Sequence, residues 1–165
     1  GVILVMLFMA LYYRLPGILA DIALVLYTIF VLALFKIFGI TVTLAGVAAF
    51  ILSVGMAVDA NVLIFERMKE ELRKGKSLSG SVETGFKRAW TSIRDSNIAS
   101  IITASVLFMF GSGIIRGFAV VLIVGVLVSM FTAVNVTKTL LRLVIKKKIF
   151  SKSWMYLGAG SEDER

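Results

Sequence analysis

The sequence predicts an all-α, polytopic bundle of transmembrane helices, and two observations carry this prediction. First, 59% of the 165 residues are hydrophobic, well above the roughly 45–50% typical of soluble domains. Second, apolar runs of about 20 residues, long enough to cross a bilayer, alternate with stretches rich in charge. The net charge of +8 lies in blocks that flank the apolar runs, as in loops that face anionic lipid. The sequence therefore predicts contact with membrane lipids and no binding of nucleic acid.

The chain is expected to consist of a transmembrane domain, residues 1–148, and a tail, residues 149–165, that is predicted to be disordered. Residues 1–12 are apolar but too short to cross a bilayer. We expect them to be the end of a span whose beginning is missing, in a fragment of a longer protein. Four complete spans follow, at residues 17–38, 41–65, 97–115 and 118–141.

The stretch of residues 66–95 is expected to leave the hydrocarbon and to form an amphipathic cytoplasmic loop. Gly75 is expected to stop one helix, and Ser77 to cap a second helix that runs to about Ile93. Its apolar residues recur at helical spacing, so this helix either lies along the membrane face or packs against other helices outside the membrane. A further cap, at Asp95 or Ser96, is expected to start the next span.

Orientation follows from the distribution of Lys and Arg. Sixteen of the 18 lie in the Tyr13–Gly17 turn, the Glu66–Asp95 stretch or the segment from Lys138 onward, and the other side carries only Lys36 and Arg116. Because cytoplasmic loops carry an excess of Lys and Arg, the charge-rich loops are expected to be cytoplasmic.

One acid, Asp59, lies inside an apolar span. The stretch from Thr41 to Val58 carries no charge, and a dense block of charge begins only at Glu66. Asp59 therefore lies roughly 10 Å from the charged end of its helix, at about 1.5 Å per residue. Ionisable groups at that depth are costly and mark ion or proton paths. We predict that Asp59 is a proton relay, and the alternative is a structural acid that hydrogen-bonds to a neighbouring helix.

Gly55 and Asn61 are predicted to support Asp59. Gly55 lies one turn earlier on the same helical face, and small residues allow helices to approach closely. We therefore expect a neighbouring helix, rather than lipid, to cover this face. Asn61 points to a different side and is expected to pack against another helix.

The polar residues of the last two spans include Thr103, Thr132, Asn135 and Thr137. They either line a hydrated path to Asp59 or bond to backbone carbonyl groups of their own helices. The chain has no His and no Cys, and the spans hold no nucleophile–base set and no cluster of metal ligands. We predict no catalytic residue, no metal and no cofactor.

Several motifs in this chain resemble the SecD family of bacterial protein-export membrane subunits. The most specific motif is Gly55–Glu71, and it is joined by Gly85–Ala89, Ile115–Ala119 and Ser129–Val134. The companion SecF subunits usually carry Ile-Asn-Asp-Thr where this chain reads Val58–Asn61. This difference favours SecD.

The resemblance implies half of a pseudo-symmetric transporter core of the resistance–nodulation–division type. Proteins of the SecD family have six spans, with a large extracytoplasmic domain between the first two. Asp59 matches the family's intramembrane acid, and Arg116 matches an arginine of its hairpin motif.

The resemblance also implies a function in the bacterial inner membrane. Members of the family pair with SecF, assist the SecYEG channel and are thought to use proton flow to move preproteins outward. Two alternatives remain open for this chain. One is a related proton-coupled exporter of lipids or small molecules, and the other is a scaffold of the translocon that transports nothing.

Overall fold

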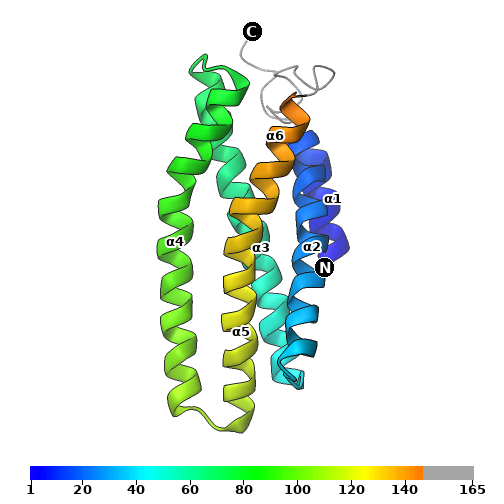
Figure 1. The fold of residues 1–165 in the computed structure, drawn as a ribbon, viewed down its shortest axis with the longest axis vertical. Coiled ribbons are helices and arrows are strands. Elements are labelled where there is room, and N and C mark those ends of the chain that lie inside the picture. Colours follow the sequence, from blue (N-terminus) through cyan, green and yellow to red (C-terminus); the bar gives the residue numbers. More distant parts are fainter. Residues whose placement is uncertain (147–165) are drawn as a thin grey trace.

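The computed structural model describes residues 1–146 and confirms the predicted all-α fold. The tail predicted to be disordered, residues 149–165, lies outside the described residues. The described part is a helical bundle with short connections (Figure 1). Its elements are α1 (Val2–Tyr13), α2 (Leu15–Ile37), α3 (Leu44–Arg73), α4 (Leu78–Phe110), α5 (Gly113–Phe131), the π-helix η1 (Thr132–Thr137) and α6 (Lys138–Lys146).

A tight turn at Arg14 joins α1 to α2. The backbone of Arg14 has a φ of 53°, in the left-handed region, and Pro16 lies in the first turn of α2, where its missing N–H is not needed. Gly17 has no room for a side chain, because a Cβ atom there would collide with the carbonyl oxygen of Met9. The predicted turn is therefore confirmed, and it packs α1 tightly along α2.

Local signals define the ends of α3 and the start of α4. The Thr43 hydroxyl accepts a 3.1 Å hydrogen bond from the backbone N–H of Gly46 and caps α3. Gly75 has a φ of 81° after the end of α3, a conformation that glycine adopts without strain. Ser77 then accepts a 3.2 Å hydrogen bond from the N–H of Gly80. The predicted stop at Gly75 and the predicted cap at Ser77 are confirmed.

The expected break before the third complete span is wrong, since α4 is one helix of 33 residues. Ser96 and Asn97 donate hydrogen bonds of 3.1 and 2.7 Å to the carbonyl oxygen of Ile93. Their side chains therefore bond back into the preceding turn and do not cap a new helix. The sequence between Phe86 and Phe110 contains no Gly and no Pro that would end the helix.

The first half of α4 packs against the bundle. Val82, Phe86 and Ile93 are buried in a cluster with residues of α1, α2, α3 and α6, whereas Trp90 is 36% exposed. Of the two interpretations of this amphipathic segment, packing against other helices is confirmed. The boundaries of the membrane-spanning portions remain predictions.

The last predicted span is interrupted by a π-helix. The α-helical part, α5, begins at Gly113, five residues before the expected start at Phe118. It passes directly into the π-helix η1 and then into α6. The segment Thr132–Thr137 contains several β-branched residues, which crowd an α-helical turn. Single π-helical turns within α-helices are frequent at functional sites.

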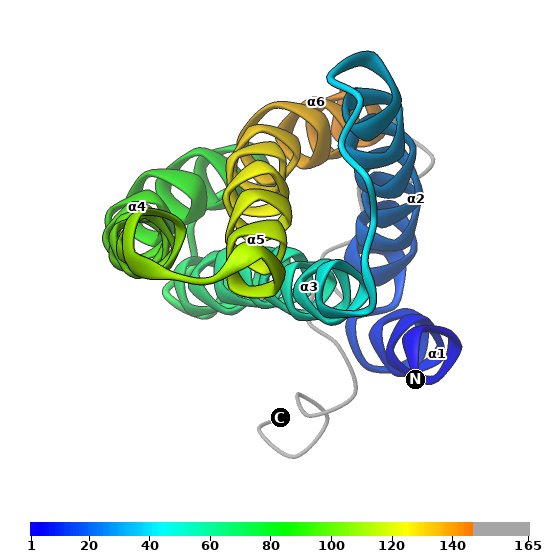
Figure 2. The same ribbon diagram turned by 90° about the horizontal axis from the view of Figure 1, so that it is seen from below.

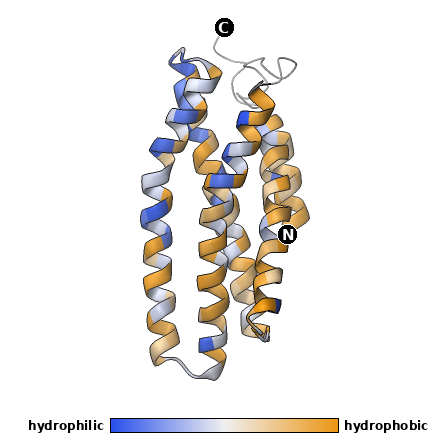
Figure 3. Ribbon diagram, in the orientation of Figure 1, coloured by the Kyte–Doolittle hydropathy of each residue, from blue (hydrophilic) through white to orange (hydrophobic). Residues whose placement is uncertain are grey.

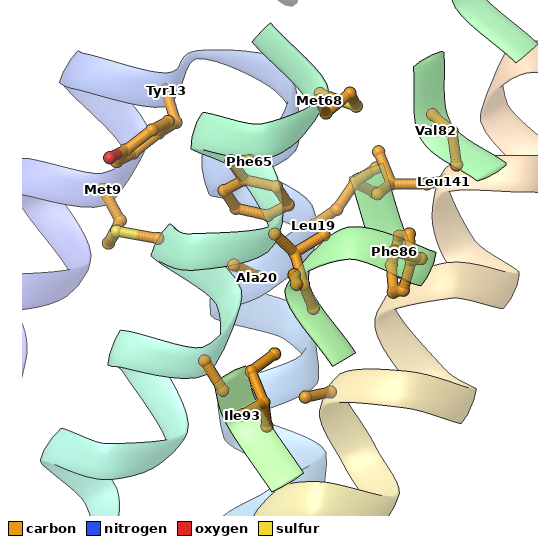
Figure 4. Close-up of a cluster of buried hydrophobic side chains, with 14 residues drawn as sticks. Met9, Tyr13, Leu19, Ala20, Phe65, Met68, Val82, Phe86, Ile93 and Leu141 are labelled. Atoms are coloured by element: carbon orange, nitrogen blue, oxygen red, sulfur yellow. The ribbon is translucent and has the colours of Figure 1, made fainter. Parts of the chain in front are cut away.

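Seen from below, α2, α3, α5 and α6 surround the centre of the bundle, α4 lies beside α3 and α5, and α1 lies against α2 (Figure 2). Two hydrophobic clusters fill the interior. The upper cluster, near the α3–α4 connection, combines side chains from α1, α2, α3, α4 and α6 (Figure 4). The lower cluster includes Tyr27, Val31, Ala57, Val121 and Val126.

Within residues 1–146, four helical stretches are long and apolar enough to cross a membrane: Leu15–Ile37, Leu44–Arg73, Leu78–Phe110 and Gly113–Ile145. Many large apolar side chains on their outer faces are exposed, as expected for surfaces that contact lipid. Hydrophilic residues gather at the end where α3 and α4 are joined (Figure 3). The fold is that of a multi-pass membrane protein.

Candidate functional site

Asp59 lies near the middle of α3 and lines a groove between α3 and α4. The groove has a volume of about 180 Å³. Besides Asp59, α3 contributes Met56, Ala60 and Leu63, and α4 contributes Ile93, Ser96, Asn97 and Ser100.

The α4 wall of this groove is mostly polar. The donors of Ser96 and Asn97 are used within the helix, and Ser100 donates a 3.1 Å hydrogen bond to the carbonyl oxygen of Ser96. Hydroxyl and amide oxygens can still accept a hydrogen bond while their donors are engaged. The volume also suffices for several water molecules, each of which needs at least about 10–15 Å³. The groove is thus suited to hydrate a carboxyl group.

The carboxyl group of Asp59 makes no hydrogen bond and no ion pair with any of residues 1–146. Its side chain is exposed to the groove. A structural acid would be expected to bond to a neighbouring helix, and within this part of the chain none provides a partner.

The prediction that a neighbouring helix covers Gly55 is wrong for the described part of the chain. A Cβ atom at Gly55 would meet nothing within 4 Å, and the residue is exposed. Close approaches instead occur elsewhere on α3, where Gly46 faces Val121 and Ser53 faces Gly125. Within residues 1–146, Gly55 is therefore uncovered, and Asp59 is exposed although it lines the groove between α3 and α4.

Asn61 points away from Asp59 into the bundle, as predicted. It is buried, and its Oδ1 accepts a 2.9 Å hydrogen bond from the hydroxyl of Thr137 at the end of η1. This bond is one of few buried polar contacts between helices and links α3 to η1.

The other residues predicted to support the site do not gather around Asp59. Thr132 donates to the carbonyl oxygens of Val128 and Ser129, both at 3.1 Å, and Asn135 donates to that of Phe131 at 3.0 Å. Each side chain thus bonds to the backbone of its own helix, one of the two interpretations made from the sequence. Thr103 behaves in the same way, with a 3.0 Å bond to the carbonyl oxygen of Ala99.

Arg116 lies in the first turn of α5, far along the bundle from the middle of α3. Its Nε donates a 3.0 Å hydrogen bond to the carbonyl oxygen of Gly111, and its side chain is exposed. Gly111 is the residue at which α4 ends. In this chain Arg116 therefore closes the connection between α4 and α5.

Contacts at the charged end hold the two walls of the groove together. A Cβ atom at Gly85 would lie 2.9 Å from the backbone nitrogen of Met68, so α3 and α4 approach closely there. Arg88 of α4 pairs with Glu71 at 2.6 Å and with Glu70 at 2.9 Å. The α3 and α4 walls are therefore fixed relative to each other above the groove.

Glu71 is the most densely paired acid of this end. Its side chain is only 4% exposed and also pairs with Lys76 and, at 3.0 Å, with Lys74. Hydrogen bonds from Lys76 and then Lys74 lower the pKa of Glu71 to about 2. Glu71 is therefore ionised throughout the physiological pH range.

Two polar features of α3 and its neighbours were not predicted from the sequence. One is the polar wall of α4, for which the spacing of Ser96 and Ser100 by one turn was an available signal. The other is a buried contact at 2.7 Å between the hydroxyls of Tyr27 and Ser53. It joins residues of α2 and α3 that are far apart in the chain, so no local pattern indicates it.

These observations define a multi-pass membrane protein with an acid, Asp59, that lies in a polar-walled groove of its helical bundle and is unpaired within residues 1–146. The family described as "Protein export membrane protein SecD/SecF, C-terminal" matches residues 1–147. The chain belongs to this family.

Curated relatives agree with this assignment. The chain is 57% identical over 145 residues to a protein translocase subunit SecD of Synechocystis, and this match covers 88% of the chain and 31% of the relative. It is also 57% identical over 157 residues to a SecD subunit of Dehalococcoides mccartyi, covering 92% of the chain and 35% of the relative. The resemblance to SecD drawn from the motifs is confirmed.

Solved structures show the same fold. The chain matches the crystal structure of SecDF, a translocon-associated membrane protein from Thermus thermophilus, with a TM-score of 0.87 and 38% identity over 90% of the chain. A second SecDF structure, in a super-membrane-facing form, matches with a TM-score of 0.85 and 37% identity over 88% of the chain. The chain spans 21% and 20% of these two solved chains and about a third of the curated relatives.

Proposed function

We propose that this chain is the membrane-embedded part of a SecD-type subunit that uses proton flow to assist the movement of preproteins across the bacterial inner membrane. Its partners in this proposal are a SecF-like subunit, the SecYEG channel and the translocating preprotein. The observation that carries the proposal is the unpaired carboxyl group of Asp59 in a polar-walled groove, in a chain of this family.

The groove supports a proton-binding role for Asp59 on physical grounds. An ionised carboxylate within a bilayer is costly unless it is hydrated or paired, whereas its protonated form is not. The polar wall formed by Ser96, Asn97 and Ser100, with room for water, lowers the cost of the charged form. Asp59 can therefore exist in both protonation states at one place, which a relay requires.

The open face beside Asp59 supports a partner subunit at this position. A Cβ atom at Gly55 would meet nothing within 4 Å in residues 1–146, and Asp59, which lines the groove between α3 and α4, is exposed. A SecF-like subunit that packs there would complete the surroundings of the carboxyl group and could supply the groups that receive its proton. In this proposal the polar residues Thr132 and Asn135 stabilise their own helix and are not proton carriers.

Sidedness follows from charge. The Glu66–Asp95 stretch and the segment from Lys138 onward carry most of the positive charge, and we assign them to the cytoplasm by the excess of Lys and Arg. Asp59 then lies nearer the cytoplasmic end of its predicted span, residues 41–65, and a proton that arrives from outside crosses most of the bilayer before it reaches Asp59.

Cells in which the full-length protein is the only copy test this function. Asp59→Asn keeps the size and hydrogen-bonding capacity of the side chain but not its charge change. Asp21→Asn is the matched control, since Asp21 is the only other acid in the four predicted spans. We expect unprocessed precursor proteins to accumulate in the Asp59→Asn cells, as in cells without the protein, and not in the control.

The same experiment separates the two alternatives. A scaffold predicts precursor accumulation without the protein but normal export with Asp59→Asn. An exporter of lipids or small molecules predicts normal precursor processing even when the protein is absent. Either result would contradict the proposed function.

A further inference from the structure

A second groove, of about 340 Å³, does not contain Asp59, and it shares Ile93 with the groove that does. Its apolar floor comes from α3, α4 and η1, and its rim carries charge from α4 and α6. The lining residues are Ile64, Glu83, Phe86, Lys87, Trp90, Ile93, Val134 and Lys138. This volume is in the range of small-ligand sites.

The depth of the groove in the membrane follows from its distance, in residues, to the opposite end of three helices. Ile64 lies about 20 residues after the start of α3 at Leu44, and Trp90 lies about 20 residues before the end of α4 at Phe110. Val134 lies about 20 residues after Ile114, near the start of α5. About 20 helical residues cross a 30 Å hydrocarbon core. All three counts therefore place the groove at the same edge of the hydrocarbon, on the charge-rich side.

The exposure of Trp90 is consistent with a position at the edge of the hydrocarbon. Its side chain is 36% exposed on a face whose neighbours Phe86 and Ile93 are buried. Tryptophan is enriched at membrane–water interfaces, where its amphipathic ring sits at the level of the headgroups. The sequence predicted that the membrane span of α4 starts at residue 97. Because α4 is unbroken, we place the edge of the hydrocarbon earlier in this helix, near Trp90.

The rim is cationic. Lys138 bonds to Glu83 at 2.9 Å and lies 5.5 Å from the centre of the Phe86 ring, and Arg142 bonds to Glu83 at 2.6 Å. Hydrogen bonds from Arg142 and Lys138 lower the pKa of Glu83, so it is ionised at neutral pH. Lys87 is exposed and has no ion pair within residues 1–146. The rim thus combines two cations, Lys87 and Lys138, with the carboxylate of Glu83, and Arg142 adds a third positive charge beside that carboxylate.

We propose that this groove binds one anionic phospholipid of the cytoplasmic leaflet, with its phosphate at Lys87 and Lys138 and an acyl chain along Ile64, Trp90 and Val134. The charge excess of the rim matches the headgroup, and the apolar floor begins at the depth where acyl chains begin. A basic pocket between transmembrane helices on the cytoplasmic side is a recognised form of lipid site. The inference is independent of the proposed proton relay, because the groove does not contain Asp59.

Native mass spectrometry of the delipidated full-length protein tests the proposal. The probes are phosphatidylglycerol, phosphatidylethanolamine with the same acyl chains, and inorganic phosphate. We expect a preference for phosphatidylglycerol that falls by about five-fold for each lysine removed, by Lys87→Gln and by Lys138→Gln. The control Lys36→Gln/Arg73→Gln removes two exposed cations outside the groove and should leave the preference unchanged.

Glu83→Gln gives a test in the opposite direction. It releases Lys138 and Arg142 from their carboxylate partner and should tighten the binding of phosphatidylglycerol. Equal affinity of the wild type for both lipids, an equal loss in the control, or weaker binding by Glu83→Gln would overturn the proposal. Displacement of the lipid by inorganic phosphate at the same concentration would show a site for free phosphate and would also overturn it.

Discussion

The hydroxyl of Thr137 donates a 2.9 Å hydrogen bond to Oδ1 of Asn61, across the buried contact between η1 and α3. Asn61 lies two residues after Asp59 and faces the opposite side of α3. The bond links the part of α3 that carries Asp59 to the π-helical segment.

Replacement of Thr137 by Val removes this bond and keeps the shape of the side chain. It leaves Oδ1 of Asn61 buried without its partner, and we expect the free energy of unfolding to fall by about 0.5–2 kcal/mol. Thermal unfolding of the full-length protein in detergent measures the change. The control is Thr139→Val, which alters an exposed threonine of α6. Equal effects of the two substitutions would show that the bond contributes nothing specific.

Gly125 of α5 has no room for a side chain. A Cβ atom there would overlap the side chain of Ser53 and lie 3.1 Å from the hydroxyl of Tyr27. Gly125→Ala should force α3 and α5 apart and destabilise the fold by about 1–3 kcal/mol through overpacking, measured by thermal unfolding. Gly113→Ala, at a position with nothing within 4 Å, should have little effect. Wild-type stability of Gly125→Ala would contradict this packing.

In contrast to Gly125, Gly55 has room for a side chain. Because its position is open in this chain, Gly55→Leu should leave the thermal stability of the separated subunit unchanged. If a SecF-like subunit covers this face, as proposed, the same substitution should weaken copurification of the two subunits. Val47→Leu, at another exposed position of α3, is the control. Unchanged copurification would mean that this face contacts lipid.

The ion pairs of Glu71 predict a pH dependence of stability. The pKa of Glu71 is lowered to about 2 in the folded protein by its bonds to Lys76 and Lys74, whereas an unfolded chain has the ordinary value of about 4.3. Its contribution to stability is therefore fully present above about pH 4.3 and is lost as pH falls toward 2. The difference in melting temperature between wild type and Glu71→Gln should shrink over this range. A difference that is constant from pH 6 to pH 3 would contradict the assignment.

Features determined by neighbours in the chain were predicted from the sequence. Gly75 and Ser77 mark the end of α3 and the start of α4 because they act on the adjacent backbone. The lengths of the apolar runs located the four helices of residues 1–146 that are long and apolar enough to cross a membrane. The isolation of Asp59 within an apolar run indicated the candidate site before its surroundings were known.

Features that depend on distant parts of the chain were not predicted. The contact between Tyr27 and Ser53 and the bond between Thr137 and Asn61 join different helices, so no local pattern reveals them. The unbroken α4 was missed because Ser96 has the side chain of a cap but bonds back to Ile93. The open space at Gly55 could not be foreseen, since small residues indicate a close neighbour without naming which chain supplies it.

The most direct measurement is the rate of preprotein export by sealed vesicles that carry the channel, the SecF-like partner and the full-length protein, under an imposed proton gradient. We predict that Asp59→Asn inserts and assembles normally but loses the gradient-dependent part of the rate, while ATP-driven export continues. Asp59→Glu should retain part of it, since it keeps the carboxyl group and adds one methylene. Export by the Asp59→Asn vesicles at the wild-type rate under the gradient would contradict the proton-relay role of Asp59.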